Sequence, residues 1–187
     1  MQKRRNQPPC ASGFTLIELV ITMTIAAILL AMATPNLSDF LRRQRLISAA
    51  DGFASAIAQA RSGAAATNSY VTIAPIGAAW NNGWQVFSEH STPDGAFTTS
   101  DTLISQYDPI PSDIAITFNT NPDATGYVAF SPVGYSITAA TRSQLTATAT
   151  FTLGTLQRVV EINALGRSRV CDPSRDTTCT ASALAPP

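Results

Sequence analysis

The 187-residue chain has few charged residues and few of the groups that enzymes use in catalysis. Charged side chains make up 13% of the sequence, well below the roughly 25% usual in soluble domains. There is one histidine, His90, and no Gly-x-Ser-x-Gly, Cys-x-x-Cys or phosphate-loop motif. These absences argue against a hydrolytic triad, a thiol redox centre and a nucleotide site. We therefore predict a protein that is not an enzyme and that uses no cofactor or metal ion.

Hard oxygen ligands suitable for calcium are present in Asp94, Asp101 and Asp108. Their spacing matches no known calcium loop. We interpret them as solvated turn residues.

The few charges are unevenly distributed. Lys3, Arg4 and Arg5 are the only charges before residue 14, and without them nine basic and twelve acidic residues remain, a balance of −3. From Arg142 onward there are five arginines and no lysine, so the basic character of the chain lies close to its C-terminal end.

A long apolar run covers residues 14–33, interrupted by Glu18 and a few threonines. Twenty helical residues span about 30 Å, the thickness of a bilayer core. The basic cluster before the run favours an N-terminus in the cytoplasm, with the rest of the chain on the far side. The small residues at 31–34 also permit an ordinary secretory signal cleaved after the run, which is the alternative.

The sequence Gly13-Phe14-Thr15-Leu16-Ile17-Glu18 stands before the apolar run. It resembles the class III signal of type IV pilins and type II secretion pseudopilins. The resemblance implies that a prepilin peptidase removes a leader, residues 1–13, by cutting between Gly13 and Phe14. The same enzyme methylates the new N-terminal Phe14, and residues 14–35 are retained as a transmembrane and assembly segment.

Glu18 is an unusual residue to find in an apolar helix. A carboxylate at the centre of a bilayer costs on the order of 2.5–3.5 kcal/mol, so it needs a partner. Cleavage would create an α-ammonium group on Phe14, and the resemblance implies that Glu18 of one subunit meets Phe14 of its neighbour during assembly. The alternative is that Glu18 lies at the headgroup boundary and has no specific partner.

Residues 36–68 continue the helix as an amphipathic half, because apolar residues such as Leu37, Phe40, Phe53 and Ile57 recur at helical spacing. The remaining residues, 69–187, form a β-rich head, since short β-branched and aromatic runs alternate there with turn signals. The predicted fold class is α+β: a long N-terminal helix packed on a small antiparallel β-sandwich. We expect strands in six ranges: 70–74, 84–88, 114–118, 126–130, 147–153 and 157–163.

The head carries a narrower resemblance. The segments Gly83-Trp84-Gln85-Val86-Phe87 and Gly166-Arg167-Ser168-Arg169 are similar in kind and order to those of the GspH/FimT group of pilin-like proteins. One departure is Glu89, which stands where aspartate is more usual. In FimT-like minor pilins a Gly-Arg-x-Arg motif near the C-terminus binds DNA during uptake.

Arg167 and Arg169 are therefore the main candidate DNA-binding residues, and Arg158 and Arg175 could extend the patch. If the segment is extended, Arg167 and Arg169 share one face, and guanidinium groups bind phosphate oxygens in bidentate fashion. Contact would be with the DNA backbone and sensitive to salt. The alternative is that Arg167 and Arg169 pair with Glu161, Asp172 or Asp176, or pack on neighbouring subunits.

Cys171 and Cys179 remain as a pair if Cys10 is removed with the leader, and we expect them to form a disulfide in an oxidising compartment. The resemblances together imply a minor pilin of a type IV pilus that binds DNA, or alternatively a GspH-like pseudopilin of type II secretion. Its implied location is the inner membrane, with the head in the periplasm, and later the extracellular pilus. The implied partners are other pilins or pseudopilins, the peptidase, an inner-membrane assembly platform, DNA and the lipid bilayer.

Overall fold

The computed structural model describes residues 13–90, 93–122, 125–139 and 141–180, and of residues 32–36 it describes the backbone alone. The predicted leader, apart from Gly13, lies outside the described residues, and so does Cys10. The chain divides into two compact units, one reaching to Leu41 and one beginning at Arg42, and each is described by itself.

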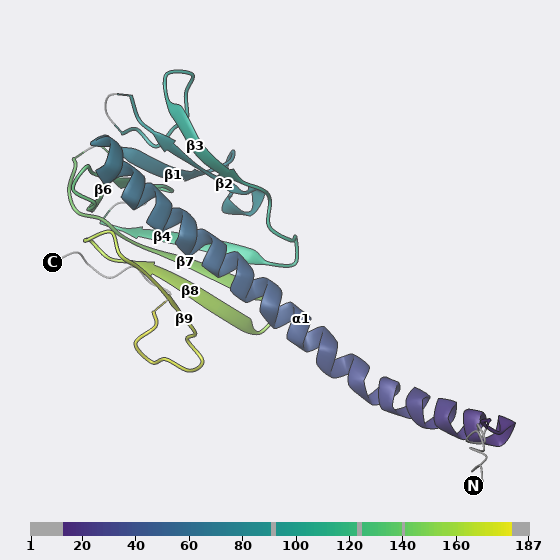
Figure 1. The fold of residues 1–187 in the computed structure, drawn as a ribbon. Coiled ribbons are helices and arrows are strands. Elements are labelled where there is room, and N and C mark those ends of the chain that lie inside the picture. The colour runs from purple at the N-terminus through teal and green to yellow at the C-terminus, as the bar shows by residue number, and fades with distance from the viewer. Residues whose placement is uncertain (1–12, 91–92, 123–124, 140, 181–187) are drawn as a thin grey trace, which may run out of the picture. The chain divides into compact units, whose positions relative to one another are not determined.

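One helix and nine strands are present in the described residues, with a short 3₁₀ turn (Figure 1). In chain order the elements are α1 (Leu16–Thr67), β1 (Val71–Pro75), η1 (Trp80–Asn82), β2 (Trp84–Ser88), β3 (Thr102–Tyr107), β4 (Ala115–Asn121), β5 (Val128–Phe130), β6 (Ser136–Ile137), β7 (Thr146–Leu153), β8 (Leu156–Ile162) and β9 (Ser168–Cys171).

Helix α1 ends in a compact hydrogen-bonded cap. Asn68 follows the last helical residue with a φ of 50°, and the amide of Ser69 donates to the carbonyl of Ala64 at 3.2 Å. This six-to-one bond is the Schellman pattern, for which asparagine is an accepted residue at the left-handed position. The cap turns the chain directly into β1, close to the predicted helix end at Asn68.

The part of α1 in the second unit buries one face. Its fully or nearly fully buried residues recur at intervals of three and four positions and comprise Leu46, Ala50, Phe53, Ala56, Ile57, Ala60 and Ala64. Phe53 lies at the centre of an aromatic cluster, with ring centroids 5.3 Å from Trp80, 5.2 Å from Trp84 and 5.8 Å from Phe151. The small alanines allow the helix backbone to approach the strands closely.

Two antiparallel sheets complete the second unit. The first has the strand order β3-β2-β1-β5-β6 and the second the order β4-β7-β8-β9. Both sheets contribute side chains to the core that contains the buried face of α1, for example Ile73 from β1 and Phe151 from β7. In Figure 1 the helix lies across both sheets in this unit.

The predicted fold class is confirmed: a long helix packs on small antiparallel sheets. Each of the six predicted strand ranges overlaps an observed strand. Strands β3, β6 and β9 were not predicted, because β3 has mostly exposed side chains and β6 and β9 are short.

No helix in the described part of the chain is both long enough and apolar enough to cross a membrane. The transmembrane segment predicted for residues 14–35 is therefore not confirmed, and the side chains at 32–35 fall outside the described residues.

Replacing Phe53 with alanine should destabilise the protein by about 3–5 kcal/mol, because it empties the centre of a close-packed aromatic cluster. Thermal or denaturant unfolding followed by circular dichroism measures the change. Ser55→Ala, at an exposed position on the same helix, is the control and should alter stability little. Equal stability of the two variants would contradict the placement of Phe53 at the core.

Candidate functional site

The first residues of the described chain are exposed and capped. Gly13 is exposed and the Phe14 side chain is 80% exposed. The hydroxyl of Thr15 accepts a hydrogen bond from the amide of Glu18 at 3.3 Å, just before α1 begins at Leu16. Thr15 and Glu18 have the spacing of a capping box, a helix-start signal that was not among the predicted features. The roles predicted for Gly13, Phe14 and Glu18 in processing and assembly stay predictions.

Apolar side chains in the first unit have little to pack against. Each of the following is at least 46% exposed: Phe14, Leu16, Ile17, Leu19, Val20, Ile21, Met23, Ile25, Ile28, Leu29, Leu30, Leu37, Phe40 and Leu41. Soluble monomers rarely expose a continuous apolar surface of this extent. A surface of this kind is typical of segments that contact a membrane or other protein chains.

The turn between β8 and β9 places the two motif arginines. The side-chain oxygen of Asn163 accepts hydrogen bonds from the amides of Leu165 and Arg167, at 3.1 and 3.0 Å. Gly166 has a φ of 73°, which a residue with a side chain rarely adopts. The turn leaves Arg167 exposed at the entrance to β9 and sets Arg169 directly opposite Glu161 on β8.

Arg169 is closely bound to acidic and hydroxyl groups. Its Nε and Nη2 donate to Oε2 of Glu161 at 3.0 and 2.8 Å, and its Nη1 lies 3.5 Å from a carboxylate oxygen of Asp176. Nη1 and Nη2 also donate to the hydroxyl and the carbonyl of Thr178. The pairing of arginine with acid, which the sequence left open, is therefore found at Arg169.

Arg158 and Arg175 share a third carboxylate. Both form ion pairs with Asp172, and for Arg175 the nitrogen–oxygen distance is 3.8 Å. A hydrogen bond from the Ser174 hydroxyl and another from Arg158 lower the pKa of Asp172 to about 2. Asp172 is therefore charged at neutral pH and offsets part of the positive charge that these arginines were expected to add.

Arg167 differs from the other three arginines. Its side chain is exposed, and within the described ranges no carboxylate pairs with it. The structure thus separates the four predicted DNA-binding residues into one unpaired cation and three that are paired.

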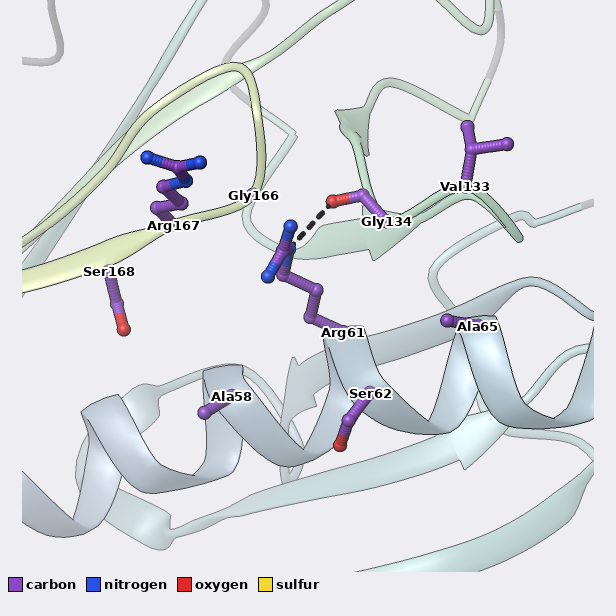
Figure 2. Close-up of a pocket in the computed structure, with 9 residues that line it drawn as sticks. All are labelled: Ala58, Arg61, Ser62, Ala65, Val133, Gly134, Gly166, Arg167 and Ser168. Carbon is purple, nitrogen blue, oxygen red and sulfur yellow. Dashed lines mark hydrogen bonds between the residues drawn. The ribbon is translucent and has the colours of Figure 1, made fainter.

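Arg167 lines a surface pocket together with a residue far from it in the sequence, Arg61 of α1. We call this the Arg61 pocket; its lining residues are Ala58, Arg61, Ser62, Ala65, Val133, Gly134, Gly166, Arg167 and Ser168. Figure 2 shows Arg61 extending from α1 toward Gly134, whose carbonyl accepts a hydrogen bond from Nε at 3.0 Å. Arg61 was not among the predicted site residues, and no local signal links it to Arg167.

The cysteines expected to pair, Cys171 and Cys179, are joined by a disulfide. Both sulfur-bearing residues pack against Val159 of β8, and the amide of Thr180 donates to Oε1 of Glu161 at 2.8 Å. The chain after β9 is thereby held beside β8. Glu161 and the two cysteines also form a group of possible metal ligands among the described residues, but oxidised sulfurs offer no thiolate to a metal.

The acidic residues after β2 serve local structure. Asp101 accepts hydrogen bonds from the amides of Thr98 and His90, at 2.8 and 3.2 Å, and Asp94 accepts one from the amide of Ala96. Glu89 is buried, and this burial raises the pKa of its carboxyl group. These bonds agree with the interpretation of Asp94 and Asp101 as turn residues.

Comparison with protein families gives two matches. The profile described as type II transport protein GspH matches residues 49–166, and that described as prokaryotic N-terminal methylation motif matches residues 9–34. The first match covers more than half of the chain. A comparison with curated proteins gives no match.

Among solved structures, the chain is similar to the type IV minor pilin FimU of Pseudomonas aeruginosa. One crystal form gives a TM-score of 0.54 at 18% identity over 72% of this chain and 94% of that one. A second gives 0.50 at 16% identity over 68% and 93%. The minor pseudopilin EpsH from the type 2 secretion system of Vibrio cholerae aligns with a TM-score of 0.46 at 9% identity, over 69% and 98%. At these identities the likeness to FimU shows a shared fold.

The lowered pKa of Asp172 predicts a loss of stability in acid. Because its pKa is near 2 when folded and near 3.8 when unfolded, its stabilising contribution is complete above pH 3.8 and is lost as the pH falls toward 2. Asp172→Asn should lower stability at neutral pH by no more than about 1 kcal/mol, as for a surface ion pair, and should flatten this acid dependence. Melting temperatures between pH 2 and 6 test it, with Asp51→Asn on α1 as the control; identical profiles for the two variants would be the contrary result.

Proposed function

The chain belongs to the family described as type II transport protein GspH, and from this premise we propose that it is a minor pilin of a type IV pilus. It enters the inner membrane as a precursor with its head in the periplasm. Prepilin peptidase cuts between Gly13 and Phe14 and methylates Phe14, and an inner-membrane assembly platform then inserts the subunit into, or at the start of, a filament that reaches the cell surface.

The exposed apolar side chains of the first unit are the observation that carries this proposal. Together with the match to the methylation motif at residues 9–34, they support a helix that leaves the bilayer only to pack among the helices of other pilins. Glu18 places a carboxylate within this apolar surface, close to the start of α1. In the proposal its carboxylate meets the α-ammonium group of Phe14 on a neighbouring subunit, because an unpaired charge in apolar surroundings is costly.

Glu18→Ala should reduce incorporation into filaments to the background level while leaving the amount of membrane-bound protein unchanged. The measurement is immunoblotting of sheared filaments and membranes from cells that express each variant. Thr22→Ala, one turn along the helix, is the control, since the hydroxyl of Thr22 bonds only within the helix, to the carbonyl of Leu19. Normal incorporation of Glu18→Ala would remove the assembly role from this residue.

We also propose that the end of the β8–β9 hairpin contacts the phosphate backbone of DNA, as a step in DNA uptake. The support is the Gly166–Arg169 motif together with the exposed, unpaired guanidinium of Arg167. Arg169, Arg158 and Arg175 have a smaller part than the sequence suggested, because Glu161, Asp172 and Asp176 offset their charge. Binding at such a site is weak, insensitive to sequence and reduced by salt.

The pairing of Arg169 predicts an order of effects. Arg167→Gln should weaken DNA binding about tenfold at low salt, the loss expected for a hydrogen bond to a charged group. Arg169→Gln should weaken it less, because this side chain is already engaged by Glu161. Fluorescence anisotropy with a labelled oligonucleotide and the detergent-solubilised protein gives both values. An equal or larger loss for Arg169→Gln, or no binding by the unmodified protein at low salt, contradicts the proposal.

A second candidate is a minor pseudopilin of type II secretion, a structural subunit without a DNA contact. The description of the matching family as a type II transport protein favours it. The two candidates share the assembly mechanism and differ in the phenotype of a deletion strain. Loss of natural transformation with normal protein secretion supports the pilus, and the reverse supports the secretion system.

A further inference from the structure

The Arg61 pocket contains positive charge that none of its lining residues offsets. Among its lining residues are two arginines, Arg61 and Arg167, and no aspartate or glutamate. Arg61 is half-buried, and within the described residues its one recorded hydrogen bond is from Nε to the Gly134 carbonyl. A partly desolvated guanidinium group has further donors to satisfy, and a cation away from water favours an anionic partner.

The pocket is a built feature of the fold, because two glycines make room for Arg61. A Cβ atom added to Gly166 would lie 2.2 Å from the carbonyl oxygen of Gly134 and 3.2 Å from Nε of Arg61. One added to Gly134 would lie 3.3 Å from the same Nε. Gly134 and Gly166 both have positive φ angles, 85° and 73° respectively. The β5–β6 turn and the β8–β9 turn are thus held against each other with the Arg61 side chain between them and α1 (Figure 2).

The contact between the two turns is reinforced by a buried hydroxyl. Ser136, at the start of β6, is fully buried, and its hydroxyl lies 2.6 Å from the carbonyl of Leu145 and 2.8 Å from that of Asn163, either of which can accept its one proton. Asn163 is also the residue that organises the Arg167 turn. The position of Arg167 therefore depends on the same packing that positions Arg61. The two cations belong to one structural unit, although they come from distant parts of the sequence.

We propose that the Arg61 pocket is a phosphate-binding subsite, in which Arg61 and Arg167 together hold one phosphodiester group of a nucleic acid. This inference rests on the proposed DNA contact, to which it adds a second cation and a defined binding pocket. A volume of about 510 Å³ lies within the range of ligand pockets and accommodates a phosphate group with part of its flanking sugars.

The chemistry of the lining favours a phosphodiester. The non-bridging oxygens of a phosphodiester can accept hydrogen bonds from donors on different sides. Guanidinium groups bind such oxygens through paired N–H groups. Ser168 points from β9 toward α1 in Figure 2, and its hydroxyl has no hydrogen-bond partner within the described residues. It provides a third donor on the same wall. The apolar lining residues Ala58, Ala65 and Val133 make no demand for a particular base, which suits recognition of the backbone alone.

A carboxylate placed in the pocket tests the inference without removing any contact. Ala58 is exposed on α1 and precedes Arg61 by three positions, so Ala58→Glu puts an acid within reach of Arg61. Ala58→Gln has the same size without the charge. We expect Ala58→Glu to bind a labelled duplex oligonucleotide about tenfold more weakly than Ala58→Gln, with equal melting temperatures. Equal affinities of the two variants overturn the proposal.

The salt dependence of binding tests whether the two arginines share one phosphate. The plot of log K against the logarithm of the salt concentration has a negative slope. Loss of one phosphate contact makes this slope shallower by about 0.9 on duplex DNA. If Arg61 and Arg167 hold the same group, Arg61→Gln, Arg167→Gln and the double variant each lose about one such unit. Arg45→Gln, an exposed arginine on the same helix, is the control and should keep the slope. A slope that is shallower by about two such units in the double variant contradicts a phosphate shared by the two arginines. So does an Arg61→Gln slope equal to that of Arg45→Gln.

These outcomes separate the inference from the function it rests on. If the unmodified protein does not bind DNA at low salt, the proposed DNA contact fails. If it binds, and Arg167→Gln weakens binding while Ala58→Glu does not, the DNA contact through Arg167 is supported but the phosphate does not bind in the Arg61 pocket. If Ala58→Glu instead lowers incorporation into filaments and leaves DNA binding intact, the pocket is a contact between subunits and the inference is wrong.

Discussion

The packing of one face of α1 against two sheets is the interaction on which the second unit depends. Phe53 touches aromatic rings from η1, β2 and β7, so a single side chain links both sheets to the helix. Alanines on either side of it let the strands lie close to the helix backbone. The same helix carries Arg61 one turn beyond the buried Ile57. The packing of the core therefore also positions the Arg61 side chain, which lines the Arg61 pocket.

Charged residues are scarce in this chain, and most of the arginines near its C-terminal end form ion pairs. Three of the four predicted DNA-binding arginines have their charge offset by Glu161, Asp172 and Asp176. The disulfide closes the segment that supplies Asp172 and Asp176. Such pairs at a surface contribute little stability, but they determine which guanidinium groups are available to a ligand. Arg61 and Arg167 line a pocket whose lining residues include no aspartate or glutamate.

Two surfaces with different physical character thus occur in one chain. The first unit presents apolar side chains with two carboxylates, Glu18 near its start and Asp39 near its end, and the apolar part suits lipid and other helices. The second unit presents a small cationic hollow on a rigid pair of turns, which suits a single anionic group. In the proposed function, assembly of a filament would use the first surface of every subunit, whereas the second would contact an anion in this subunit alone. A minor subunit can therefore add a specialised contact without changing how the filament is built.

The sequence alone determined the features that depend on near neighbours. Helical spacing correctly placed Phe53 and Ile57 on the buried face of α1, but Leu37 and Phe40, which it also placed there, are exposed. The β-rich runs between turn signals located most strands, and the Gly13–Glu18 motif was enough to indicate the family. Strands β3 and β9 were not predicted because exposed or very short strands carry little periodic signal. The tertiary structure alone decided which arginines are paired, because Glu161 faces Arg169 only through the register of β8 and β9. It also placed Arg61 beside Gly134, 73 positions away. Contacts of this kind form when distant segments close on one another, and no local pattern of residues records them.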